Sequence, residues 1–178
     1  MNDIKTHILD TAEKLFNQAG YSAVGVDLIR DTAGVSKTTI YRHFPGKQSI
    51  IAAVLRRRDA FFRSGLSTAV ASAITPSDKI QALFDWHYDW FKSSTFCGCM
   101  FMHGLPEFRT QSQELQQIAT EHKAWILALI NEILTETKYN QQQANLFMAL
   151  LEGSIVNAEF FGFIRPDPEI ARLINQIG

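Results

Sequence analysis

Hydrophobic residues recur every three or four positions along most of the chain, which is the spacing of amphipathic helices. In the N-terminal part this pattern predicts helices over residues 4–19 and 26–33, a third after Ser36, and a fourth that begins near Lys47. Gly20 is expected to stop the first of them. No stretch alternates between polar and apolar residues for long enough to indicate a strand. The sequence therefore predicts an all-α protein.

The segment from Ala33 to Phe44 is the most informative part of the chain. Gly34 can adopt the positive φ that a tight turn between helices needs, and Ser36 can cap the next helix. Ile40 and Phe44 lie four residues apart and are expected to face inward, which leaves polar, aromatic and cationic side chains outside. A short helix of this kind suits the major groove of DNA, so the segment is interpreted as a helix-turn-helix.

The candidate DNA-binding residues are Ser36, Lys37, Thr38, Thr39, Tyr41, Arg42, His43 and Lys47. Some are expected to meet base edges through hydroxyls or an ammonium group, and others to touch phosphates. The first group comprises Lys37, Thr38 and Thr39, and the second comprises Tyr41, His43 and Lys47. Lys47 would be helped by the N-terminus of the helix that it begins.

The rest of the chain is also predicted to be helical. The expected helices cover about 47–73, 77–91, 96–106, 115–134 and 141–161, and a short terminal helix begins at Pro166 or Pro168. Thr75 or Ser77 is expected to cap the second of these. The 96–106 segment contains two glycines, which predicts a short and irregular helix.

Charge is distributed unevenly, although the formal net charge is only −1. Residues 1–58 carry nine Lys or Arg against five Asp or Glu, whereas residues 59–178 carry eight against thirteen. A basic N-terminal part suits contact with phosphate. No apolar run is long enough to span a bilayer and no leader peptide is recognisable, so a soluble cytoplasmic protein without membrane contact is expected.

The first third of the chain resembles the TetR family of transcriptional regulators in the order and spacing of its motifs. The segments that carry the resemblance are Ile8–Phe16, Gly20–Tyr21, Ala33–Ser36, Thr39–Phe44 and Lys47. The resemblance implies a DNA-binding domain over residues 1–46 and a helical effector-binding and dimerisation domain over residues 47–178. It further implies a homodimer that binds a near-palindromic operator as a repressor and is released by a small apolar or aromatic effector.

Four positions depart from the family pattern. Val24 and Gly25 stand where the family commonly has a threonine and a second hydroxyl, so a phosphate contact at the start of the second helix is in doubt. Arg30 stands where a small alanine is usual, and Thr38 where a glycine is usual. These last two substitutions are expected to add contacts to DNA.

Aromatic and sulfur-containing side chains are concentrated between Trp86 and Phe108. Such a group is either ordinary core or the lining of an apolar pocket, and the resemblance favours a pocket for an effector. The residues expected to line it are Trp86, His87, Trp90, Met100, Met102, His103, Phe108 and Trp125.

The helix over 141–161 is the predicted dimer interface, because it mixes bulky and small apolar residues on one stripe. The interface residues are expected to be Phe147, Leu150, Leu151, Ser154, Ile155 and Ala158. The alternative is that this stripe packs within its own chain.

Cys97 and Cys99 are expected to be buried, inert thiols, because their spacing with His103 is not a standard zinc pattern and a disulfide between them would be strained. No metal and no cofactor is expected. The chain also lacks a phosphate-binding Gly-rich loop, a Gly-x-Ser-x-Gly elbow and a His-Glu-x-x-His motif. A small all-helical enzyme, or an adaptor that does not bind DNA, remains the alternative function.

Overall fold

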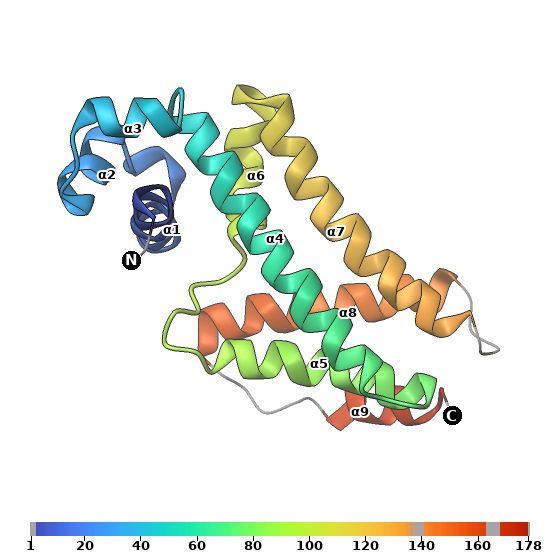
Figure 1. Ribbon diagram of the computed structural model, residues 1–178. Helices are drawn as coiled ribbons and strands as arrows, with labels where there is room; N and C mark the ends of the chain where they lie inside the picture. Colours follow the sequence, from blue (N-terminus) through green and yellow to red (C-terminus); the bar gives the residue numbers. More distant parts are fainter. Residues whose placement is uncertain (1–2, 136, 138–140, 163–167, 178) are drawn as a thin grey trace. The chain divides into compact units, whose positions relative to one another are not determined.

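The protein was analysed as a computed structural model that describes residues 3–135, 137, 141–162 and 168–177 (Figure 1). These residues form nine α-helices and no strand, which confirms the predicted fold class. The helices are α1 Ile4–Ala23, α2 Val26–Ala33, α3 Lys37–His43, α4 Lys47–Ala71, α5 Pro76–Phe91, α6 Met100–Gln111, α7 Gln113–Leu134, α8 Gln141–Phe161 and α9 Pro168–Asn175. Pro166, the alternative start of the last helix, lies outside the described residues. None of the described helices is both long and apolar enough to cross a membrane.

The chain divides into two compact units. The first unit comprises Met1–Ala60 and Cys99–Glu121, and the second comprises Phe61–Gly98 and His122–Gly178. Two helices, α4 and α7, contribute residues to both units. The predicted domain boundary between residues 46 and 47 therefore falls inside the first unit, because the first half of α4 and all of α6 pack with the N-terminal helices.

The first unit begins with a helix that bends at Gly20. This residue has a φ of 77° and a ψ of 172°, a conformation that only glycine adopts readily, and one further helical turn follows to Ala23. The predicted stop at Gly20 is thus a kink within α1. Its apolar positions Ile8, Ala12 and Phe16 are all buried, as their helical spacing predicts.

Tyr21, directly after this kink, connects α1 to α6. Its ring lies 5.1 Å from the Phe16 ring and 5.0 Å from the Phe108 ring, between centroids, and it is 2% exposed. Its hydroxyl donates a hydrogen bond to the Met100 carbonyl oxygen over 3.1 Å. Burial raises the pKa of this phenol well above its ordinary value, so the hydroxyl keeps its proton and remains a donor.

The second unit is a bundle built around α5, α8 and α9 with the later parts of α4 and α7 (Figure 1). Thr75 caps α5 by accepting a hydrogen bond from the Asp78 backbone N–H, which settles the alternative between Thr75 and Ser77. Ser77 instead donates its hydroxyl to the Ile174 carbonyl and so holds α9 against the start of α5. The Phe84 and Phe147 rings, 6.4 Å apart, join α5 to α8 in the core.

Removing the Tyr21 hydroxyl should weaken the first unit. We expect Tyr21→Phe to lower the free energy of unfolding by about 1 kcal/mol, because a buried hydrogen bond between α1 and α6 is lost while the ring packing is kept. Urea unfolding followed by circular dichroism measures this. Tyr41→Phe is the matched control, since Tyr41 is 45% exposed. Equal stability of the two variants would show that the Tyr21 hydrogen bond contributes nothing.

Candidate DNA-binding surface and effector site

The turn between α2 and α3 has the local geometry of a helix-turn-helix. Gly34 adopts φ 65° and ψ 31°, and the Ser36 hydroxyl accepts a hydrogen bond from the Thr39 backbone N–H over 3.0 Å. His7 Nε2 lies 3.0 Å from the Ala33 carbonyl oxygen and ties α1 to the end of α2. Ile40 is fully buried, so one side of α3 is anchored in the core of the first unit.

The opposite side of α3 is open to solvent. Lys37, Thr38, Tyr41 and Arg42 are exposed, as the sequence predicts for residues that touch DNA. Thr39 and His43 are half-buried, and the Thr39 hydroxyl lies 2.8 Å from the Ser36 hydroxyl. The hydroxyls of Thr39 and Ser36 are therefore engaged with each other at the cap of α3. The residues best placed to meet a base edge are Lys37, Thr38, Tyr41 and Arg42.

Asp27 and Arg30 form ion pairs beside this surface that sequence reasoning missed. Asp27 Oδ1 lies 3.1 Å from Lys37 Nζ and 2.8 Å from Arg30 Nη1, and Arg30 also pairs with Asp31. The hydrogen bond from Lys37 lowers the pKa of the Asp27 carboxyl. The spacing of Asp27 and Arg30 was a sequence signal for a pair on one helix. The contact between Asp27 and Lys37 depends on the turn that joins α2 to α3, so helix spacing alone gave no signal for it.

The start of α2 offers no side-chain hydroxyl. Val24 is fully buried, and Gly25 caps α2 without a side-chain hydrogen bond.

Lys47 begins α4, where backbone N–H groups at a helix N-terminus have no partner in their own helix. Its side chain is half-buried. Ser49 shapes the turn before it, because its hydroxyl accepts from the Gly46 N–H and donates to the Gly46 carbonyl. A cation beside free N–H groups suits a phosphate.

The residues predicted to line one effector pocket are divided between the two units. Met100 and Phe108 are buried in the core of the first unit, while Met102 and His103 on the same helix are exposed. Trp86, His87, Trp90 and Trp125 belong to the second unit. Neither unit contains the predicted set as one lining, because α6 belongs to the first unit, where it packs with α1 through Tyr21, and α5 belongs to the second.

Within the second unit, an aromatic cluster surrounds Phe62. The Phe62 ring centroid lies 4.9 Å from both Trp86 and Trp90, 6.0 Å from His87 and 5.3 Å from His122. Phe62 and His122 were not among the sequence candidates. They lie on α4 and α7, far from α5 in sequence, so helix periodicity carried no signal that they meet it. Trp125 lies elsewhere on α7, with its ring 4.8 Å from the Arg63 guanidinium carbon.

His87 is the polar centre of this aromatic cluster. It is 1% exposed, and its Nδ1 lies 2.8 Å from the Leu83 carbonyl oxygen. Nε2 is buried without a hydrogen-bond partner among the described residues. The pKa of the imidazole is lowered from 6.5 to about 4, mainly by burial and in smaller part by the positive charge of Lys123, so His87 is neutral at pH 7.

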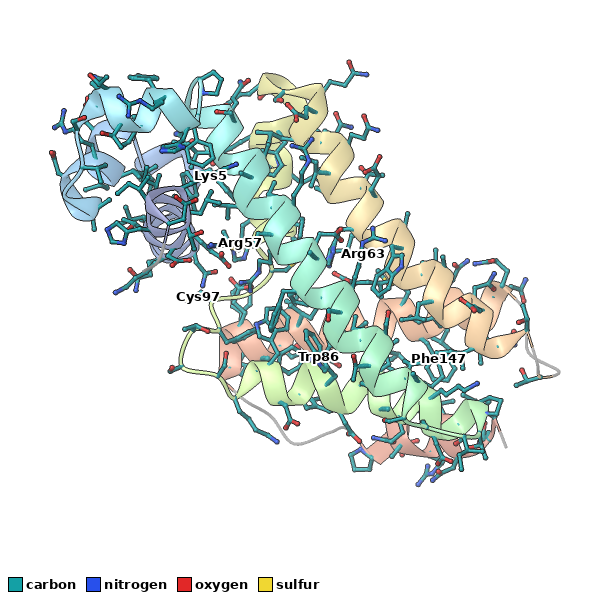
Figure 2. The ribbon with its side chains drawn as sticks, in the orientation of Figure 1. Lys5, Arg57, Arg63, Trp86, Cys97 and Phe147 are labelled. Carbon is teal, nitrogen blue, oxygen red and sulfur yellow. The ribbon has the colours of Figure 1, made fainter. Side chains whose placement is uncertain are left out.

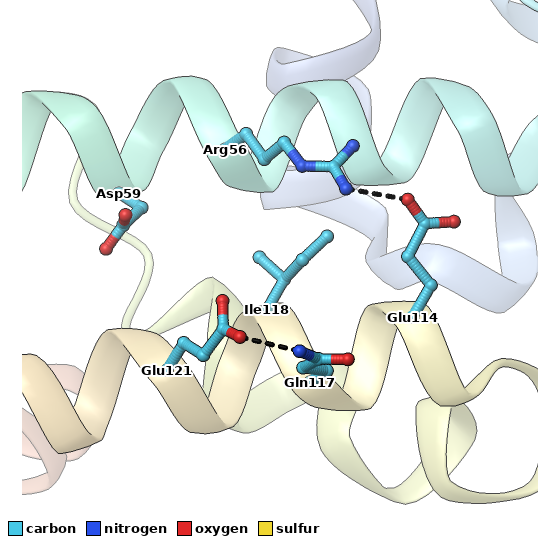
Figure 3. Close-up of a pocket in the computed structure, with 6 residues that line it drawn as sticks. All are labelled: Arg56, Asp59, Glu114, Gln117, Ile118 and Glu121. Atoms are coloured by element: carbon cyan, nitrogen blue, oxygen red, sulfur yellow. Dashed lines mark hydrogen bonds and ion pairs between the residues drawn. The ribbon is translucent and has the colours of Figure 1, made fainter.

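The first unit contains a different, polar cavity of about 170 Å³ between α4 and α7 (Figure 3). It is lined by Arg56, Asp59, Glu114, Gln117, Ile118 and Glu121. Arg56 pairs with Glu114 and Gln117 donates to Glu121 across 2.7 Å each, so these groups already satisfy one another. Such a lining does not match the apolar pocket that the sequence predicts.

Most of the α8 residues predicted to form the dimer interface are buried within their own protomer. Phe147, Leu151, Ile155 and Ala158 are all at most 5% exposed within their own protomer, and Leu150 and Ser154 are half-buried. The bulky stripe packs into the bundle, because it is the face that covers α5. A second apolar stripe on the same helix is exposed; it consists of Leu146, Ala149, Gly153, Val156 and Phe160.

Both cysteines are free thiols; Cys99 is buried and Cys97 is half-buried. Among the described residues, no group of three His, Cys, Asp or Glu side chains is placed to hold a metal ion.

Comparisons with known proteins agree with this geometry. Residues 8–54 match the family model described as bacterial regulatory proteins, tetR family. The chain is 24% identical over 176 residues to the HTH-type transcriptional repressor NemR of Escherichia coli K12, an alignment covering 93% of this chain and 88% of NemR.

Solved structures share the fold. The TetR-family transcriptional regulator SCO4454 from Streptomyces coelicolor matches with a TM-score of 0.87 and 24% identity, over 98% of this chain and 89% of that one. FadR from Bacillus subtilis, in complex with stearoyl-CoA, matches with a TM-score of 0.75 and 18% identity, over 95% and 96% of the two chains.

The fold, the α2–α3 turn and these matches define a DNA-binding transcriptional regulator of the helix-turn-helix class. Residues 8–54 match the tetR family model, and a relative named as an HTH-type transcriptional repressor aligns over most of the chain, as the sequence motifs predicted. The family and its named relatives are regulators and not enzymes.

The buried His87 should make the protein sensitive to acid. Its pKa is about 4 when folded and 6.5 when exposed, so the unfolded chain takes up the proton first and stability is lost as the pH falls below 6.5. Between pH 7 and pH 5 this group should cost about 2 kcal/mol of unfolding free energy. Urea unfolding at both pH values checks this. His87→Phe should lose that much less than the wild type, and equal losses would contradict the assignment.

Proposed function

We propose that the protein is a ligand-responsive repressor that binds a near-palindromic DNA operator as a homodimer and is released by a small apolar or aromatic effector. The observation that carries the proposal is α3, which is capped by Ser36 and anchored by Ile40 while Lys37, Thr38, Tyr41 and Arg42 face solvent. One such helix makes too few base contacts for useful specificity, so two copies are needed on two half-sites.

The two copies meet through the exposed stripe of α8. Its members Leu146, Ala149, Gly153, Val156 and Phe160 are spaced by three and four residues and so form one continuous face. Phe160 is 75% exposed and Leu146 is 46% exposed, which is unusual for residues of this size on a helix that is otherwise packed. Ala149 and Gly153 are small enough to let a second helix approach closely.

The effector binds at the aromatic cluster around Phe62. This cluster combines an apolar surface with a few polar groups, His87 and His122 among them, as small-molecule sites do. Phe62 and Lys47 belong to the same helix, α4, so a ligand that displaces Phe62 acts on the helix whose first residue meets phosphate. The relative NemR is named a repressor, and the structural neighbour FadR was solved with stearoyl-CoA.

An enzyme or a helical adaptor without DNA contact is the competing function. A gel-shift assay against a pool of genomic fragments separates these classes, because only a DNA-binding regulator retards a subset of fragments at physiological salt. Failure to retard any fragment would overturn the proposed function.

Lys47→Ala should weaken binding to all DNA sequences alike. We expect the slope of log affinity against log salt concentration to fall by about one counterion per bound protomer, because one phosphate contact is lost. Fluorescence anisotropy with the selected operator at several salt concentrations measures this. Lys92→Ala is the control, since that exposed lysine lies at the end of α5, outside the DNA-binding residues. A wild-type affinity and slope for Lys47→Ala would remove Lys47 from the DNA contact.

Val156→Glu should split the dimer and leave the protomer folded. A carboxylate at the centre of an apolar seam must be desolvated there, which costs several kcal/mol, whereas Val156 in the free protomer is 37% exposed. Leu151→Glu on the opposite face should unfold the protein, because Leu151 is fully buried. Sedimentation velocity and circular dichroism distinguish the two results. An unchanged dimer for Val156→Glu would exclude this face as the interface.

A further inference from the structure

His87 is a buried residue whose Nε2 receives no hydrogen bond from any described residue. Its Nδ1 faces the Leu83 carbonyl at 2.8 Å, and a carbonyl oxygen only accepts, so Nδ1 must carry the proton. The neutral ring therefore presents a lone pair at Nε2, which is buried and has no hydrogen-bond partner among the described residues. An unsatisfied buried acceptor is costly, and a ligand that supplies a donor recovers that cost on binding.

Aromatic rings surround this acceptor. The His87 centroid lies 5.3 Å from Trp86, 6.0 Å from Phe62 and 6.2 Å from Trp90. Flat apolar molecules pack well against such rings, edge to face or offset.

Trp86, labelled in Figure 2, is the half-exposed part of this enclosure. Its indole lies directly against Gly65. A Cβ built on Gly65 would lie only 2.5 Å from the indole Nε1 of Trp86, so the indole occupies space that glycine alone leaves open. Phe61, which is 59% exposed, covers the outer side with its ring 5.7 Å from Trp86.

Lys123, whose positive charge acts on His87, is already paired with a carboxylate. The Lys123 ammonium is held by both carboxylate oxygens of Glu152, at 2.7 and 3.0 Å, and the Arg63 guanidinium lies against Trp125. His122, which packs on Phe62, is also buried. A carboxylate placed at His87 Nε2 would set two acceptors against each other and lose its hydration.

We propose that the effector is a neutral aromatic compound with a hydroxyl or N–H group that donates a hydrogen bond to His87 Nε2, beneath Trp86. This inference rests on the proposed function in placing the effector at the aromatic cluster, and it adds the chemical class. Phenols are the simplest members of that class. Ionised aromatic acids and purely hydrocarbon rings of the same size offer no donor to this acceptor and should bind more weakly.

Three probes of matched size test the inference on the full-length protein. Phenol offers a donor, toluene replaces the hydroxyl by a methyl group, and benzoate offers only acceptors. Binding is measured by titration of the tryptophan emission excited at 295 nm. We expect phenol to bind the wild type at least about tenfold more tightly than toluene or benzoate, the ratio that one satisfied buried polar group supplies.

His87→Phe keeps a ring and removes the acceptor. We expect this variant to lose the preference for phenol by about tenfold while it binds toluene at least as well as the wild type does. Trp125→Phe is the matched control, because Trp125 packs on Arg63 and should leave the order of the probes unchanged. If His87→Phe fails to fold, the order of the three probes on the wild type decides alone.

Toluene or benzoate binding as tightly as phenol, or no binding of any probe, overturns the inference. Retention of the phenol preference in a folded His87→Phe variant does the same. A separate gel shift with phenol tests the proposed function. If phenol binds in the expected order but leaves the protein on DNA, the His87 inference stands and the proposed effector response is wrong.

Discussion

A single helix, α4, supplies apolar side chains to the cores of both units, and this constraint governs much of the structure. Its early residues Ile50, Val54 and Leu55 are fully buried in the first unit, and Phe62 and Leu66 are buried in the second. Such a helix cannot present one simple amphipathic face along its whole length. Its polar residues also make defined contacts. Arg57 and Arg58 in the first unit pair with carboxylates of α1, including Glu13.

On the candidate DNA-binding surface, the ammonium group of Lys37 is held in an ion pair and is still exposed to solvent. The pairing of Lys37 with Asp27 holds the lysine beside the turn before DNA arrives, and both groups remain exposed. An exposed ion pair is worth little in water, so a phosphate or a base edge can replace Asp27 as the partner at small cost. Arg30, which the sequence suggested as an additional DNA contact, is instead shared between Asp27 and Asp31 in the free protein.

The helix α8 offers two candidate faces for a dimer interface. It is apolar on two sides, since Leu151 and Ile155 face the bundle while Leu146, Val156 and Phe160 face outward. The interface was predicted on the stripe with the bulkier residues. In the structure, these large apolar side chains fill the core of their own protomer. A stripe interrupted by Ala149 and Gly153 is the one that a second helix can approach.

The sequence by itself determined most of the helices, the turn at Gly34, the cap at Ser36 and the exposed residues of α3, because each of these depends on neighbours within a few positions. The helix predicted over 96–106 is the exception, since α6 begins at Met100 and continues through Pro106 to Gln111. Local steric limits and helix periodicity act over that range, and the family motifs lie entirely within it. Only the tertiary structure decided that α6 packs on Tyr21, that Phe62 and His122 join His87, and that Lys37 finds Asp27. These contacts join residues from different helices. They form because whole helix faces are buried against one another, and no local sequence pattern specifies which faces meet.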